Sequence, residues 1–60
     1  MKFNIVYFIK TADSQIAIPN KTNPIAAKNI KELLPAIAAN IQYGTELELP
    51  IVGIHITLAE

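Results

Sequence analysis

The side chains with the clearest chemical potential are two glutamates near the carboxyl end of the chain. Glu46 and Glu48 are two residues apart in a stretch that alternates like a strand, so we expect both carboxylates on one side, about 6.5 to 7 Å apart. An inverting glycosidase could use carboxyl groups at that separation. Such a pair also needs a cleft, for which a chain of 60 residues has little room. We therefore expect both side chains on a solvated surface.

The one histidine, His55, alternates with Ile54 and Ile56 and is expected to point away from the core. One histidine and two carboxylates on a flat sheet are too few ligands for a metal site without help from another subunit. The chain has no cysteine, so thiolate ligands and disulfides are excluded. We predict no metal and no cofactor.

No other pattern of catalytic residues is present. Ser14 and the threonines have no second histidine or buried acid to activate them, and there is no glycine-rich phosphate loop. We therefore predict that the chain is not an enzyme. Catalysis by Glu46, Glu48 and His55 remains as a minor alternative.

The charged residues are divided unevenly along the chain. Residues 1–31 hold five Lys and one Asp (+4), whereas residues 32–60 hold four Glu (−4). Lys21, Lys28 and Lys31 lie around the start and the polar side of an expected helix and could suggest nucleic-acid contact. Because the chain has no arginine and its pI is about 6.5, nucleic-acid binding is the alternative and not the main prediction.

The composition predicts one small ordered domain at residues 1–60, because 52% of the residues are hydrophobic and 17% are charged. A domain this small buries only about 60% of its unfolded surface, so oligomerisation is the remaining means of stabilising it. The apolar stretch between Lys2 and Lys10 is shorter than a typical signal-peptide core, and no apolar run is long enough to span a membrane. We expect a cytoplasmic protein without membrane contact.

The first part of the chain is predicted to form a β-hairpin, with strands at 2–10 and 15–18. Apolar side chains occupy every odd position from 3 to 9, which is typical of a strand with one buried face. The other face of this strand carries Val6 and Phe8. That face therefore also needs cover, either from the rest of the chain or from another molecule.

A helix is predicted at about 24–42. Asn23 followed by Pro24 is typical of an N-cap and a first helical residue. One continuous apolar stripe of this range is formed by Ala26, Ile30, Leu33, Leu34, Ile37, Ala38 and Ile41. Pro35 falls on the polar side, so we favour one helix kinked there; a helix that starts at Pro35 is the alternative. Gly44 is the expected stop.

Residues 45–60 alternate in two runs of different parity. A hairpin with a loop at 50–53 accounts for the change, and so does one long strand with a bulge near Pro50. We favour the hairpin, because proline inside a paired strand removes a ladder donor. The predicted fold is α+β with the order β-β-α-β-β: an antiparallel sheet of three to four strands with one Pro-kinked helix packed on one face.

The sheet face that the predicted helix does not cover indicates a role in protein binding, because it mixes apolar and polar side chains as interfaces do. We predict a small non-catalytic protein–protein interaction module that forms a homodimer around Val6 and Phe8 and binds a further protein. The candidate interface residues are Val6, Phe8, Tyr43, His55, Glu46 and Glu48. The expected topology resembles that of small phage-encoded inhibitors and antitoxin-like modules. This analogy of topology alone adds a phage or mobile-element accessory role to the prediction.

Overall fold

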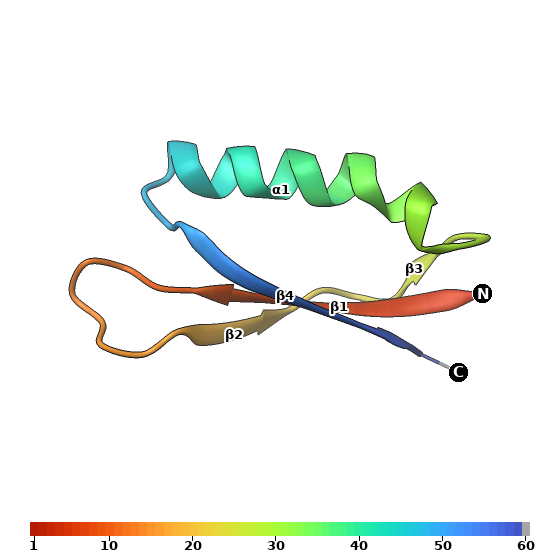
Figure 1. Ribbon diagram of the computed structural model, residues 1–60, viewed down its shortest axis with the longest axis horizontal. Coiled ribbons are helices and arrows are strands. Elements are labelled where there is room, and N and C mark those ends of the chain that lie inside the picture. Colours follow the sequence, from red (N-terminus) through yellow and green to blue (C-terminus); the bar gives the residue numbers. More distant parts are fainter. Residues whose placement is uncertain (60) are drawn as a thin grey trace.

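The computed structural model describes residues 1–59 as a four-stranded antiparallel sheet with one helix across one face (Figure 1). The elements follow the order β1 (Lys2–Ile9), β2 (Ile18–Lys21), β3 (Ile25–Ala26), the 3-10 turn η1 (Ile30–Leu33), α1 (Leu34–Glu46) and β4 (Ile51–Leu58). The predicted α+β class is confirmed. No helix within residues 1–59 is long and apolar enough to cross a membrane.

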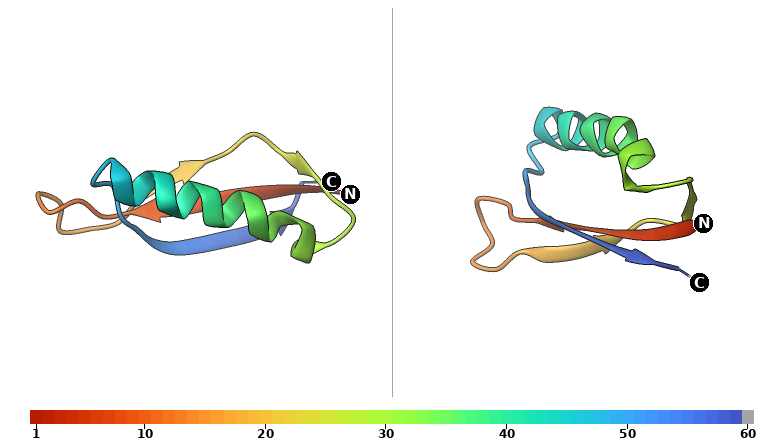
Figure 2. Two further views of the ribbon diagram at one scale, coloured as in Figure 1. Left: turned by 90° about the horizontal axis from the view of Figure 1, so that it is seen from above. Right: turned by 45° about the vertical axis from the view of Figure 1, so that its right-hand side comes forward.

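Strand β1 is the centre of the sheet. It pairs with β4 along one side and with both β2 and β3 along the other. Directly opposed residues of antiparallel strands share a face, so the register of Ile5 with Ile56 and of Tyr7 with Ile54 places all four on one side of the sheet. Helix α1 covers this side and crosses it diagonally, with its N-terminal end toward β4 (Figure 2).

The core lies between β1 and the helical layer. Its buried residues are Phe3, Ile5, Tyr7, Leu33 and Ile37. The first three are odd positions of β1, so the period-two pattern identified the buried face of this strand correctly. Leu33 ends η1 and Ile37 follows it by one helical turn, which puts both side chains on the same side of the helical layer.

The helix begins about ten residues later than predicted. Ile25–Ala26 forms β3 instead, and the N–H of Ala27 donates to the carbonyl of Met1 at 2.9 Å. This segment pairs with the free side of β1, because the backbone groups on that side of β1 would otherwise lack partners. The N-cap prediction at Asn23 and Pro24 is therefore wrong.

The helical layer starts at Asn29, whose side-chain oxygen accepts the N–H of Glu32 at 3.3 Å. This Asn-x-x-Glu spacing is close to a capping box and was the sequence signal for the true start. Pro35 is the second residue of α1, where a missing N–H removes no helical hydrogen bond. The kinked helix is therefore wrong, and the alternative start at Pro35 is correct to within one residue.

Gly44 does not stop the helix, which continues to Glu46. The chain turns after it, with Glu48 at a φ of 58°, and the N–H of Leu49 returns to the carbonyl of Gly44 at 2.7 Å. A Cβ atom on Gly44 would lie 2.8 Å from the carbonyl oxygen of Leu49. This glycine therefore allows the loop to fold back against the last turn of α1.

The predicted final hairpin is wrong, because residues 45–46 belong to α1 and only one strand, β4, follows the loop. The observed order is thus β-β-α-β with the short β3 before the helix. The parity change falls where the loop after α1, which contains Leu47 and Leu49, gives way to β4. Within β4 itself there is a bulge: Phe8 opposes Gly53 and Ile9 opposes Ile51, which leaves Val52 as the extra residue. The alternative of one bulged strand is therefore closer to the structure.

Two isoleucines test the assigned core with the same substitution. Ile5 is fully buried, whereas Ile16, in the loop between β1 and β2, is 73% exposed. We expect Ile5→Val to lower the free energy of unfolding by about 1 kcal/mol and Ile16→Val to leave it nearly unchanged. Urea unfolding followed by far-UV circular dichroism at one protein concentration measures both. Equal losses in the two variants would contradict this core.

Candidate protein-interaction site

The sheet face opposite α1 is open and carries three of the predicted interface residues. Val6 and Phe8 are half-buried there, and Val6 lies between Lys21 of β2 and His55 of β4. A methyl group on Gly53 would lie 3.6 Å from the ring of Phe8, so this ring lies over the glycine. The open face is therefore an apolar centre between neighbouring polar side chains, as in small protein interfaces.

The other three predicted interface residues lie elsewhere. Tyr43 and Glu46 are exposed on the C-terminal half of α1, and Glu48 is exposed in the loop that follows. The expectation that Glu46 and Glu48 share one side of a strand is wrong, because Glu46 ends α1 and Glu48 lies in the turn after it. His55 lies on the opposite side of the sheet from α1. Glu46, Glu48 and His55 therefore do not form one site.

The remaining chemistry of the described residues is limited. Within residues 1–59 no three His, Cys, Asp or Glu side chains form a group that could hold a metal ion. The lysines of the nucleic-acid alternative are also separated. Lys21 lies opposite Val6 on the edge strand β2, whereas Lys28 and Lys31 lie around the start of η1. They therefore do not form the continuous basic surface that would track a phosphate backbone.

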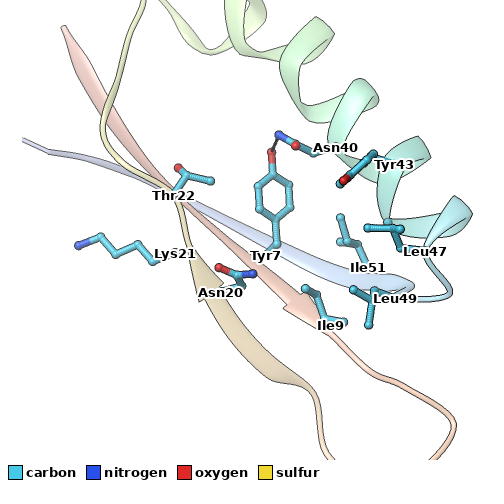
Figure 3. A pocket seen from close by; sticks show the side chains of 11 residues that line it. Tyr7, Ile9, Asn20, Lys21, Thr22, Asn40, Tyr43, Leu47, Leu49 and Ile51 are labelled. Atoms are coloured by element: carbon cyan, nitrogen blue, oxygen red, sulfur yellow. Dashed lines mark hydrogen bonds between the residues drawn. The ribbon is translucent and has the colours of Figure 1, made fainter.

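A hollow of about 280 Å³ lies between the C-terminal half of α1 and strands β1 and β2 (Figure 3). Tyr7 rises from β1 to the helix, where the Nδ2 of Asn40 donates to its Oη at 3.0 Å. Tyr43 borders the hollow and is 62% exposed. The apolar part of the lining comes from Ile9, Leu47, Leu49 and Ile51. An apolar side chain of a partner protein would fit the chemistry of this hollow, with Tyr43 as an aromatic contact at its border.

Sequence reasoning named Tyr43 as a candidate interface residue but missed the hollow beside it. Tyr7 and Asn40 are 33 positions apart, and no local pattern links them. Tyr7, which lies on the predicted buried face of the first strand, is 5% exposed and belongs to the core. The hollow therefore exists only because the helix and the sheet come together at this point.

Comparison of the chain with protein-family models, curated proteins and solved structures finds no match. No function or residue role is therefore transferred from a relative. The exposed surface of the described residues provides the basis for a functional proposal.

The hydrogen bond between Tyr7 and Asn40 is expected to contribute to stability, and Tyr43 provides the matched comparison. Tyr7→Phe removes a hydroxyl that accepts a hydrogen bond in a nearly buried position, so we expect a loss of about 0.5–1.5 kcal/mol. Tyr43→Phe removes a hydroxyl from an exposed ring and should change stability by less than about 0.5 kcal/mol. Urea unfolding of both variants measures the difference.

Addition of Asn40→Ala completes the test. If the hydrogen bond exists, Tyr7→Phe should have a smaller effect in the Asn40→Ala background than in the unaltered chain. An effect of Tyr7→Phe that is the same in both backgrounds would contradict the contact.

Proposed function

We propose that the chain is a small non-catalytic protein–protein interaction module that works as a homodimer. The observation that carries this proposal is the amount of apolar surface left uncovered. Within residues 1–59 five hydrophobic side chains are buried, whereas twelve large hydrophobic side chains are exposed. Single exposed apolar residues are common on soluble proteins, but an excess over the core of this size indicates that another surface covers part of them.

The total surface supports the same proposal. The chain exposes 4493 Å², whereas a compact monomer of its 6.6 kDa mass exposes about 3,900 Å². Its extents are 37 × 20 × 14 Å, so it is a thin slab, and its radius of gyration of 12.0 Å exceeds the roughly 10.4 Å of a compact domain of this length. The excess of about 600 Å² is smaller than the roughly 800 Å² per partner in a standard interface but of the same order.

The shape of the protein also favours association over catalysis. The uncovered apolar groups are mostly aliphatic side chains on the helical layer, the loops and the edge strands. The chemical groups that could act as acid, base or ligand are dispersed over different sides. Such a surface favours contact with another protein, because the hydrophobic effect requires apolar area and no particular chemistry. The proposal does not use the phage analogy, which assumed a final hairpin.

Sedimentation equilibrium over roughly 1 μM to 1 mM protein tests the homodimer. We expect the average mass to rise with concentration toward twice the 6.6 kDa of one chain, while far-UV circular dichroism shows a folded protein at both ends of the range. A mass of 6.6 kDa at every concentration would contradict the homodimer. The proposal of an interaction module would then require a different protein as the partner.

A further inference from the structure

The outer edge of β4 has a row of backbone groups without partners in the described chain. β4 pairs with β1 alone, and the N–H of Ala59 donates to the carbonyl of Lys2 at 2.9 Å. Inward and outward backbone groups alternate along an antiparallel strand. The N–H and C=O groups of Ile54, Ile56 and Leu58 therefore point away from β1, toward the free side of the sheet.

The opposite edge of the sheet is formed partly by β2 and is protected. The N–H of Thr22 donates to the carbonyl of Ile5 at 3.0 Å, so the same alternation points the backbones of Pro19 and Lys21 outward. Proline has no N–H to offer, and an edge lysine resists pairing with another strand, which are two common ways of protecting an edge. β4 has the sequence IVGIHITL, with neither proline nor a Lys, Arg, Asp or Glu.

Apolar side chains also lie beside the β4 edge, on the helix side of the sheet. Ile54 and Leu58 oppose Tyr7 and Phe3 of the core, yet they are 38% and 58% exposed. Leu34 starts α1 at the end of the helix that lies toward β4, and it is 54% exposed. We call Leu34, Ile54 and Leu58 the β4 flank. A strand that pairs with β4 would place its own helix-side side chains against this flank.

The charges at the two ends of β4 have opposite signs. Just before β4, Asp13 and Glu48 line one shallow hollow with Pro50, and Lys10 is the cation that approaches this end. At the other end of β4, Lys31 lines an apolar hollow together with Leu58, and the backbone carbonyl of Lys2 accepts the N–H of Ala59. Glu32, next to Lys31 in η1, is the anion at this end. Antiparallel pairing of two β4 strands about Ile56 sets Ile54 of one copy opposite Leu58 of the other, and it directs the acidic end of one copy toward the Lys31 end of the other. Charge complementarity therefore favours a second copy of this chain as the occupant.

The geometry points to β4 as the seam of the dimer: two copies pair antiparallel through the outer edges of β4 about a two-fold axis. This inference rests on the homodimer proposed above and names its interface. Pairing joins the two four-stranded sheets into one, and a two-fold axis perpendicular to the sheet keeps both helices on the same side. The outward groups of Ile54, Ile56 and Leu58 then gain partners, and the two β4 flanks cover each other.

Methylation of single backbone nitrogens, by chemical synthesis of the chain, tests the seam. N-methylation at Ile54 removes an outward N–H and adds a methyl group that blocks the edge, while every side chain stays in place. Symmetry removes two hydrogen bonds from the dimer, so we expect its dissociation constant to rise by at least about 30-fold. N-methylation at Lys21 makes the same change on the β2 edge and should leave the constant unchanged. Sedimentation equilibrium measures both, with circular dichroism as the check of folding.

Phe8→Lys separates the seam from the open face, which the sequence favoured as the dimer surface. If β4 is the seam, this variant should dimerise like the unaltered chain. An unchanged dissociation constant on methylation at Ile54 would overturn the seam and leave the homodimer standing, and loss of dimer in Phe8→Lys would then place the interface on the open face. Absence of any dimer in the unaltered chain would overturn both proposals.

Hydrogen exchange on the unaltered chain gives a second test, which decides the matter if the methylated chain fails to fold. The amide protons of Ile54 and Ile56 should exchange more slowly as protein concentration rises, whereas that of Lys21 should not respond. Exchange at Ile54 and Ile56 that is independent of concentration across the monomer–dimer transition would overturn the seam.

Discussion

The pairing of β1 along both of its sides is the constraint on which the rest of the structure depends. β4 takes one side, and β2 and β3 share the other, so every other strand of the described chain is held by β1. The same strand supplies three of the five core residues. Because strand pairing fixes which side chains share a face, β1 also determines which residues of its neighbours lie under the helix and which lie on the open face.

The small core links stability to function in this protein. Five buried side chains and one hydrogen bond, which Asn40 of the helix donates to Tyr7, connect the layers of a slab that is 14 Å thick along its shortest axis. Domains of this size without disulfides or metals commonly gain stability from association. The exposed apolar residues can therefore serve both purposes, because a partner that covers them also adds to the effective core. Under the proposed function, folding and binding of this chain are not independent.

The proposed dimer uses only part of the exposed surface. Pairing through β4 joins the two sheets edge to edge, so it leaves the open face around Val6 and Phe8 uncovered. It also leaves the hollow beside Tyr43, which lies on the β2 side of the helix. Both surfaces would appear twice in a two-fold symmetric dimer, on a sheet of twice the width. A further protein could thus contact both copies, which raises its apparent affinity without any new contact chemistry.

The sequence by itself determined the first strand, its buried face, the α+β class and the presence of one amphipathic helix, because these depend on local periodicity. It misplaced the helix start, since Asn23 and Pro24 looked like a cap and Ala26 fits the helical stripe, and only the free side of β1 selects a strand at Ile25 and Ala26. It also assigned Leu47 and Leu49 to a strand, although both residues lie in the turn around Glu48 that follows α1. The tertiary structure alone decided that Tyr7 meets Asn40 and that the backbone of β4 faces outward at Ile54. Contacts of this kind depend on register between distant segments, which the local pattern of either segment does not encode.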